Sequence, residues 1–441
     1  MISYINQTIT MYVIFPMLVL MGIYLSWKLR FLQFSKLKMS FKQLFERQED
    51  AQGNLSRMQT IASVLAGNFG TGNIAGMAVA LTAGGPGSLV WMWVIAFFGS
   101  IIQYASCLLA VKYRTQNQRG EYVGGPMYYL SVALGSKTLA ILFAVSVLLG
   151  AIGVGIFAQM NSMILSMEPL GCPMWLATLL ITVTVALIIM GGIKRVAQVS
   201  SAVVPVMALL YLGASAVILT LYVRELPQAF FTLIQAALAP SALIGGAFGY
   251  SFLQIVSTGL GRALFATDVG TGYVPILQAG AKTQHPVIDG LVSLVAPLLV
   301  MIICTVTALV LMVTGAYQVI GLKSAQMVLY AFQQGIGEYA GGLIVAISLF
   351  LFGYTTIIAW ACCFERAVGY LFNDRFRRSF LWLFIAMIPI GAVLNVDFVW
   401  AFADTTLTCM TLCNLIGILG LSREVITESQ EFFSERKLPV S

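Results

Sequence analysis

The sequence contains few charged residues. Asp, Glu, Lys and Arg make up only 9% of its 441 residues and 59% are hydrophobic, whereas a soluble domain carries about 25% charged residues. This composition predicts an integral membrane protein surrounded by a lipid bilayer. The net charge of +7 does not by itself indicate a nucleic-acid partner or an acidic substrate, and we expect no nucleic acid.

Residues typical of hydrolytic and metal-dependent enzymes are also scarce. His285 is the only histidine, and the seven cysteines include no CxxC pair. A zinc site needs such clusters, and no Ser/His/Asp or Cys/His set converges in the sequence. We therefore expect neither an enzyme nor a bound cofactor.

Apolar stretches of about 17–25 residues are long enough to cross a bilayer. The sequence holds eleven such spans, near residues 10–31, 57–83, 87–111, 138–166, 174–191, 199–222, 240–264, 287–315, 341–369, 380–394 and 398–420. Every basic residue except Arg224 and Lys323 falls at the end of an odd-numbered span, in the loop after it, or in the C-terminal tail. The positive-inside rule then predicts an N-terminus outside the cell and a cytoplasmic C-terminus, in the inner (cytoplasmic) membrane.

Three segments near the ends of the chain or between spans carry further predictions. No basic segment precedes the first apolar run, so residues 10–29 are interpreted as a retained span and not a signal peptide. Residues 36–50 are basic and amphipathic, which is typical of a helix on the cytoplasmic membrane surface but also fits a solvated linker. The tail from Ser422 has glutamates at helical spacing, and we expect an exposed, dispensable helix there.

The second span is interrupted at residues 66–76, AGNFGTGNIAG. Each glycine lowers helix stability by roughly 1 kcal/mol relative to alanine. A lipid-facing helix does not tolerate such a break, because its freed N–H and C=O groups would have no partners. A broken helix at membrane depth therefore predicts a protein-lined site that holds a small ligand.

A second glycine-rich interruption, around Gly245 and Gly246, lies in the seventh span. The two interrupted helices are five spans apart, so they cross the membrane in opposite senses. This predicts an all-α membrane protein with about 11 transmembrane helices and a five-plus-five inverted repeat, spans 2–6 and 7–11, preceded by an extra N-terminal span. The domain boundaries would be 10–31, 56–225, 226–420 and 421–441, although two glycine-rich spans can also coincide by chance.

Polar groups inside the spans suggest what the site binds. At a broken helix, free N–H groups suit a carboxylate and free carbonyls suit an ammonium group or Na⁺. Charged side chains are almost absent from the spans, with Asp404 and Glu365 as the nearest exceptions, and an ion pair is the simpler interpretation of Glu365.

Four further positions in the spans are candidates for a ligand contact, and most also have a simpler interpretation. Gln159 lies beside two glycines and is a candidate contact, although its amide could equally bond a neighbouring helix. Thr355 and Thr356 could coordinate Na⁺ or simply bond the preceding helical turn, and Trp360 one turn later could close over the ligand.

The order of several motifs resembles the alanine/glycine:cation symporter family, also called sodium:alanine symporters, over roughly residues 10–420. The matching motifs are GTGNIAG at 70–76, GGPG at 84–87, LAVKYR at 109–114, GGPMYY at 124–129, QMNS at 159–162, GGIKR at 191–195, AKTQHP at 281–286, Trp360 through Glu365 and Arg366, and VWAFAD at 399–404. The resemblance implies the leucine-transporter fold with one added N-terminal span.

The resemblance also implies roles for individual residues. Thr71, Gly72, Asn73, Gly245 and Gly246 would hold the backbone groups of a small amino acid. Gln159 and Trp360 match family pocket positions. Thr355 and Thr356 match a hydroxyl pair that binds Na⁺ beside the backbone of the first broken helix, at Ala66 and Asn68.

The sequence departs from the family pattern in three places. Gln103 and Ser106 replace a Lys and an acidic residue in the third span, residues 266–270 read ATDVG where the family has Ser-Asn-Glu-Ala-Gly, and the usual pattern at residues 407–413 is absent. We expect Na⁺-coupled import of alanine or glycine by alternating access. A proton-coupled or differently selective transporter of the same fold, a channel and a membrane enzyme remain the alternatives.

Overall fold

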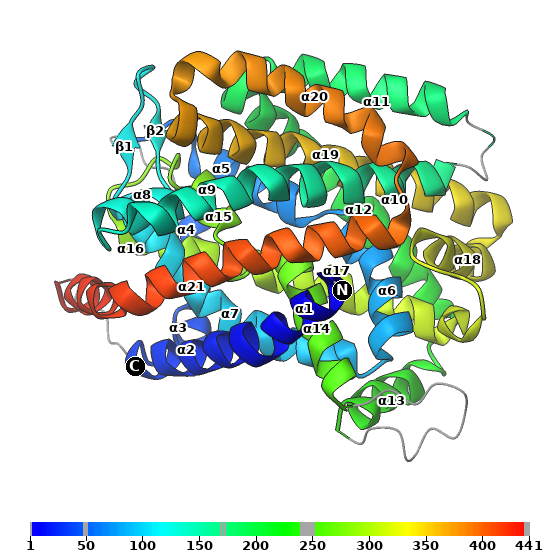
Figure 1. The fold of residues 1–441 in the computed structure, drawn as a ribbon. Helices are drawn as coiled ribbons and strands as arrows, with labels where there is room; N and C mark the ends of the chain where they lie inside the picture. The colour runs from blue at the N-terminus through cyan, green and yellow to red at the C-terminus, as the bar shows by residue number, and fades with distance from the viewer. Residues whose placement is uncertain (1, 47–51, 168–170, 172, 239–251, 436–441) are drawn as a thin grey trace.

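The structure is a computed structural model that describes residues 2–46, 52–167, 171, 173–238 and 252–435. Apart from one short hairpin, the described residues form helices, and the long helices run roughly parallel or antiparallel to one another (Figure 1). The first part of the chain comprises α1 (Ile2–Ile9), η1 (Thr10–Ile14), α2 (Phe15–Lys28), α3 (Leu32–Ser35), α4 (Leu37–Phe45), α5 (Arg57–Asn68), η2 (Thr71–Asn73), α6 (Ala75–Gly84) and α7 (Ser88–Lys112).

The strands of the hairpin are antiparallel and follow α7. The elements from there to the first undescribed gaps are β1 (Thr115–Gln116), β2 (Tyr122–Val123), α8 (Pro126–Val132), α9 (Lys137–Ile152), η3 (Gly153–Phe157), α10 (Ala158–Met167), α11 (Met174–Ile189), α12 (Gly192–Leu221) and α13 (Leu226–Leu238). The last part comprises α14 (Phe252–Thr267), α15 (Tyr273–Gln278), α16 (Pro286–Ser293), α17 (Val295–Val313), η5 (Ala316–Gln318), α18 (Ala325–Ile336), α19 (Glu338–Phe372), η6 (Asp374–Phe376), α20 (Arg377–Val393) and α21 (Val396–Glu435).

The helices agree with an all-α membrane protein. Among the described residues, eight helices are long and apolar enough to span a bilayer, and they coincide with eight of the eleven predicted spans. Of the other three spans, two correspond to α11, which has 16 residues, and to the interrupted pair α5–α6, and the described part of the seventh is covered by α14. The count of eleven, the inverted repeat and the domain boundaries stay predictions.

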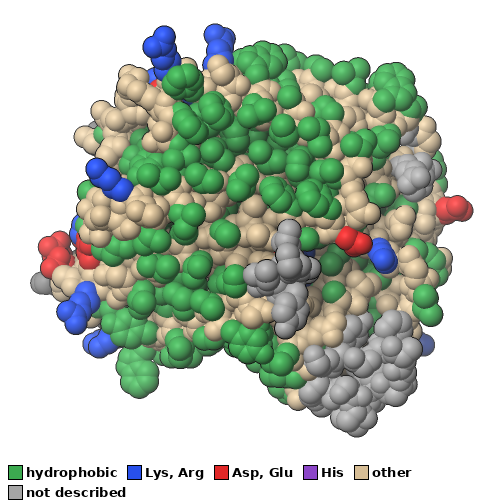
Figure 2. Space-filling view, in the orientation of Figure 1, with side chains coloured by type: hydrophobic (Ala, Val, Ile, Leu, Met, Phe, Trp, Pro, Cys, Tyr) green, Lys and Arg blue, Asp and Glu red, His purple; other side chains and the backbone are tan. Residues whose placement is uncertain are grey.

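Apolar side chains cover most of the surface that Figure 2 presents, and most of the Lys and Arg side chains in that view gather at its left-hand end. Leu209 on α12 is 74% exposed, and Trp175 on α11 and Trp382 on α20 are also exposed. Large apolar side chains on the outside of a helical bundle are typical of a protein that faces lipid, because water would make such a surface costly.

The predicted interruption of the second span is present. α5 begins with a capping box, in which Ser56 accepts from the amide of Gln59 and the Gln59 side chain accepts from the amide of Ser56. The helix ends at Asn68, the short η2 turn follows, and α6 begins at Ala75. Every residue from Gly67 to Ala78 is buried, so the break lies inside the protein and not against lipid.

A second interruption lies farther along the chain than we predicted. Gly245 and Gly246 fall outside the described residues, so the predicted break there stays a prediction. Instead, α14 ends at Thr267 and α15 begins at Tyr273, and the connecting residues 268–272 are all buried. Gly270 and Gly272 have φ angles of +76° and +85°, a region that glycine enters at little cost.

The C-terminal tail differs from the expectation of an exposed helix. α21 continues without interruption to Glu435, and Ser429, Phe432 and Phe433 are buried. The Tyr104 hydroxyl on α7 lies 2.7 Å from Ser429 Oγ. Tyr113 donates to Glu424, and burial raises the pKa of this phenol to about 12, so it stays protonated. The tail therefore packs against the bundle, because the face of this helix that carries no glutamates is apolar.

Candidate ligand site at two interrupted helices

The two interruptions lie against each other. Asn68, the last residue of α5, donates through Nδ2 to the carbonyl of Thr267, the last residue of α14, at 3.1 Å. Asn73 donates to the carbonyl of Asn68 at 2.6 Å, and the Cys304 thiol on α17 lies 3.4 Å from Asn73 Oδ1. Asparagine side chains thus replace part of the hydrogen bonding that each interrupted helix loses. Asn68 and Asn73 therefore stabilise the first interruption.

Carbonyl oxygens of the first break converge on one hydroxyl. Thr356 Oγ1 on α19 lies 3.1 Å from the carbonyl oxygen of Ala66 and 3.4 Å from those of Gly67 and Phe69. The same hydroxyl lies 2.8 Å from the carbonyl of Phe352 in its own helix. One hydroxyl hydrogen cannot satisfy four acceptors. A cluster of neutral oxygen atoms of this kind suits a small hard cation.

The neighbouring Thr355 points elsewhere. Its hydroxyl lies 2.9 Å from the carbonyl of Leu351 in the preceding turn and 3.6 Å from Met207 Sδ on α12. Adjacent residues of a helix point about 100° apart, so both hydroxyls cannot face the first break in this conformation. The structure places Thr356 with Ala66, and it places Thr355 in the bonding of its own helix.

Gln159 lies directly against the first break. Its Oε1 accepts from the amide of Thr71 at 2.9 Å, and its Nε2 donates to the carbonyl of Val154 at 2.9 Å. A Cβ atom placed on Gly70 would lie 3.0 Å from Thr356 Oγ1 and 3.2 Å from Gln159 Oε1. Gly70 therefore brings the backbone close to both side chains, and no larger residue leaves this approach unchanged.

Trp360 is fully buried and stacks on Tyr273, with 4.4 Å between the ring centroids. A Cβ atom on Gly155 would lie 2.5 Å from Trp360 Cβ, and one on Gly67 would overlap the Tyr273 hydroxyl. Glycines thus let the indole and the phenol approach the helix backbones. The rings connect α19 and α15 with the first break.

Several buried polar atoms around the breaks lack a partner. Among the described residues, Asn68 Oδ1, Asp268 Oδ1, Tyr273 OH and Trp360 Nε1 have no hydrogen-bond partner. A buried unsatisfied polar atom typically costs about 1–3 kcal/mol. Donors and acceptors left unpaired at one place suit a small ligand that carries both kinds of group.

Sequence reasoning did not select Asp268 as a site residue, although it noted that residues 266–270 depart from the family pattern. Asp268 is 2% exposed and has a positive φ of 53°. Its carbonyl accepts from the Thr271 hydroxyl at 2.8 Å. The signal in the sequence was an acidic residue next to two glycines, immediately after the end we had set for the seventh span.

The family departures at Ser106 and in the eleventh span are linked by Asn414. Its Nδ2 lies 2.9 Å from the carbonyl of Gly270 and 3.1 Å from Ser106 Oγ, and its Oδ1 accepts from the Tyr129 hydroxyl. Gln103 belongs to a different contact, because its Nε2 donates to the carbonyl of Ser293 at 2.7 Å. A network of uncharged side chains thus supports the second break.

Arg262 corrects another prediction, because it lies within α14 and not in a loop at the end of a span. Its Nη2 donates to both carboxylate oxygens of Asp404 on α21, and its guanidinium carbon lies 4.7 Å from the ring centroid of Trp400. The Phe265 and Trp400 ring centroids are 4.8 Å apart. A Cβ atom on Gly72 would lie 2.4 Å from the Phe265 ring, so these side chains form a layer over one side of the first break.

A second layer closes the other end of the same interrupted helices. The segment before α5 pairs with the segment after α15 through bridges between Gln52 and Thr283 and between Leu55 and Ala281. Arg114 donates to the carbonyls of Ala281 at 2.8 Å and of Gln52 at 3.0 Å. The two breaks therefore lie between two layers of contacts, one around Arg262 and the other around Arg114.

Glu365 lies outside these layers. It forms an ion pair with Arg377 on α20, whereas Arg366 pairs with Glu121 at 2.9 Å. The ion-pair interpretation of Glu365 is supported, with Arg377 as its partner in place of the adjacent Arg366.

Two interrupted helices that meet inside a bundle of apolar helices define a secondary membrane transporter of the broken-helix class. The chain belongs to the sodium:alanine symporter family, whose model matches residues 1–439. It is a transporter and not an enzyme, which confirms the resemblance found in the sequence.

Individual relatives support the family assignment, and a solved structure supports the fold. An uncharacterized transporter of Haemophilus influenzae is 38% identical over 429 residues, covering 96% of this chain and 94% of that protein. The sodium/alanine symporter AgcS of Methanococcus maripaludis is 36% identical over 427 residues, covering 94% and 93%. The structure of MhsT in complex with L-phenylalanine matches with a TM-score of 0.64 at 14% identity, covering 86% and 93%, and places the chain in the leucine-transporter fold.

Proposed function

We propose that this chain carries a small neutral amino acid, alanine or glycine, into the cell together with Na⁺ by alternating access. It would do so in the cytoplasmic membrane, with the N-terminus outside and the C-terminus in the cytoplasm. The observation that carries the proposal is the convergence of the Ala66, Gly67 and Phe69 carbonyls on the Thr356 hydroxyl.

Na⁺ would bind at this oxygen cluster. Backbone carbonyls and a hydroxyl are the oxygen ligands that hard cations favour. A cation there would stabilise the carbonyl end of α5, whose last C=O groups lack helical partners. Thr355 would contribute only after a change of its side-chain rotamer.

The amino acid would bind between the two breaks. The N-terminus of α6 favours a carboxylate, because helix N-termini carry free N–H groups and a partial positive charge. The ammonium group would be satisfied by oxygen acceptors such as the free Asp268 Oδ1 and Asn68 Oδ1. Trp360, stacked on Tyr273, would restrict the substrate to a short side chain.

The two closed layers would open in turn. The Arg262–Asp404 pair with Phe265 and Trp400 would form the outer gate, and the contacts of Arg114 would form the inner one. Binding of both ligands between the layers would favour the closed form, because each ligand supplies contacts that neither open form offers.

Uptake into proteoliposomes tests this function. Purified protein should accumulate labelled alanine under an inward Na⁺ gradient but not under an equal K⁺ gradient, and unlabelled glycine should compete. Saturable uptake of a different amino acid with Na⁺ would keep the mechanism and change the substrate. Uptake that neither saturates nor exceeds equilibrium would indicate a channel and contradict the proposal.

Proton coupling is a second candidate, favoured by one observation. Asp268 is a buried carboxylate at the second break with an unpartnered oxygen, and buried carboxylates in membrane proteins often serve in proton transfer. Uptake driven by an inward proton gradient in Na⁺-free buffer, and lost in Asp268→Asn, would select this candidate.

A further inference from the structure

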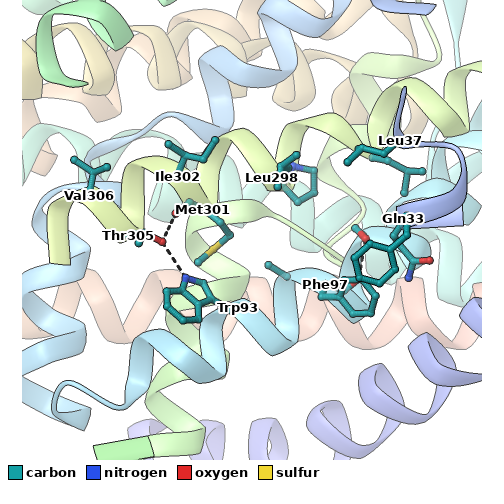
Figure 3. Close-up of a pocket in the computed structure, with 14 residues that line it drawn as sticks. Gln33, Leu37, Trp93, Phe97, Leu298, Met301, Ile302, Thr305 and Val306 are labelled. Atoms are coloured by element: carbon teal, nitrogen blue, oxygen red, sulfur yellow. Dashed lines mark hydrogen bonds between the residues drawn. The ribbon is translucent and has the colours of Figure 1, made fainter. Parts of the chain in front are cut away.

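A groove of about 450 Å³ lies away from the two breaks, between α7 and α17. Figure 3 shows that Trp93 and Phe97 of α7 face Leu298 and Ile302 of α17 across it. The α3–α4 segment closes one end with Gln33, Phe34 and Leu37. Trp93 donates to Thr305 Oγ1 at 2.9 Å near the other end, so the indole nitrogen is satisfied and the groove wall is apolar.

The groove opens toward lipid and has the length of an acyl chain. Phe34 is 70% exposed, and Leu298 and Ile302 on the groove wall are also exposed. The lining residues of α17 extend from Leu294 to Val306, a distance of roughly 18 Å at 1.5 Å per residue. An elongated apolar molecule fits such a space better than a compact polar one.

The closed end of the groove carries an unpaired polar group. Gln33 is 7% exposed, and its Nε2 donates to Ser26 Oγ at 2.6 Å. Among the described residues its Oε1, also buried, has no hydrogen-bond partner. Because an unpaired buried acceptor is costly, the occupant of the groove should supply a hydrogen-bond donor at this end.

The same end is basic. Lys28 follows Ser26 at the end of α2, Lys38 follows the groove residue Leu37 in α4, and both lysines are exposed. Exposed basic residues at the membrane surface favour lipids with a net negative headgroup. The positive charge of the two lysines therefore favours an anionic lipid over a zwitterionic lipid at this end of the groove.

We propose that this groove binds one phosphatidylglycerol molecule. An acyl chain lies between α7 and α17, a glycerol hydroxyl of the headgroup donates to Gln33 Oε1, and the phosphate lies near Lys28 and Lys38. This site is separate from the transported amino acid and from Na⁺, and it does not depend on the proposed function.

The lipid would also support the first break. Ile302 and Thr305 line the groove on α17, and between them Cys304 contacts Asn73 on the opposite side of the same helix. Filling the groove holds α17 against α7 and so keeps Cys304 against the break. Transport should therefore be faster in membranes that contain phosphatidylglycerol.

Native mass spectrometry and thermal unfolding of the purified full chain test the site. The delipidated protein should retain or rebind one phosphatidylglycerol, and this lipid should raise the melting temperature above that in phosphatidylcholine. Ile302→Trp, which fills the groove from its open side, should weaken binding by about tenfold or more. Leu209→Trp, an equally lipid-facing change on α12, should not.

Gln33→Leu provides a second test that leaves the groove volume nearly unchanged. It should weaken the preference for phosphatidylglycerol, because the glycerol hydroxyl loses its acceptor, and leave binding of the acyl chain. Equal binding of phosphatidylglycerol and phosphatidylcholine by the unaltered protein would overturn the proposal, as would equal loss in Leu209→Trp and Ile302→Trp. Equal binding of phosphatidylethanolamine would contradict the proposal that the groove prefers an anionic headgroup.

Discussion

The side-chain amide of Asn68 donates to the carbonyl of Thr267 across 3.1 Å, and so joins the last residues of two interrupted helices that are 199 positions apart in the chain. Both residues are buried. This buried hydrogen bond joins the two breaks directly.

Asn68→Ala should destabilise the protein by about 1–3 kcal/mol, because the carbonyl of Thr267 would lose its buried donor. Thermal unfolding of the purified protein measures the effect. Gln318→Ala is the control, since the Gln318 side chain is exposed and donates to the neighbouring Tyr317 hydroxyl. Equal melting temperatures for the two variants would show that the bond between the breaks contributes nothing.

Thr356→Val should raise the Na⁺ concentration for half-maximal alanine uptake by about tenfold or more, equivalent to about 1.4 kcal/mol. The reason is the loss of the one hydroxyl that faces the Ala66 carbonyl. Thr356→Ser should restore most of the affinity. Thr355→Val, which alters a hydroxyl bonded within its own helix, should have a smaller effect. A larger effect at Thr355 would place the ion elsewhere.

Gly70→Ala should abolish uptake while leaving the fold intact. The backbone at Gly70 is extended and accepts any residue, but the added methyl group would press on Thr356 and Gln159. Gly76→Ala is the matched control, because its methyl group would make only ordinary contact with Trp400 at 3.4 Å. Normal uptake by Gly70→Ala would remove this approach from the site.

Asp404→Asn should slow uptake strongly, because Arg262 would remain as a nearly buried charge without its counter-ion; breaking such a pair costs about 3–5 kcal/mol. The exchange Arg262→Asp with Asp404→Arg should recover part of the rate. Initial rates of uptake compare the variants at equal protein content. If the exchange is no better than Asp404→Asn, the pair does not act as a gate.

Deletion of residues 423–441 should lower the melting temperature, because it removes the buried Ser429 and Phe433 and the Lys112–Glu424 ion pair at 3.0 Å. Deletion of residues 436–441 alone serves as the control for truncation. A truncated protein as stable as the control would restore the expectation of a dispensable tail.

Much of the fold follows from the sequence, because a bilayer requires long apolar helices and these are visible as hydrophobic stretches. The first break was equally predictable, since glycines around Gly70 interrupt one of those stretches. The second break, between α14 and α15, was not predictable. The glycines near Gly245 led us to place a break there, and the charge of Arg262 suggested that the span ended close to it. In the structure Arg262 pairs with Asp404 inside the protein, and this contact cannot be inferred from the charge pattern.

The sequence pointed to some of the residues at the candidate site but not to how they are arranged. The structure places Thr356 and Gln159 beside the first break, yet the sequence could not distinguish Thr356 from Thr355. That distinction depends on the rotation of α19 against α5. Asp268 escaped selection because its importance arises from the turn between α14 and α15.

Reciprocal coupling tests the central claim most directly. Proteoliposomes with equal Na⁺ on both sides would receive an inward alanine gradient, and entry of radioactive sodium would be followed. The account predicts that alanine drives sodium uphill in the unaltered protein and not in Thr356→Val, because coupling between two ligands acts in both directions. Alanine entry without sodium movement would contradict Na⁺ coupling at the paired breaks.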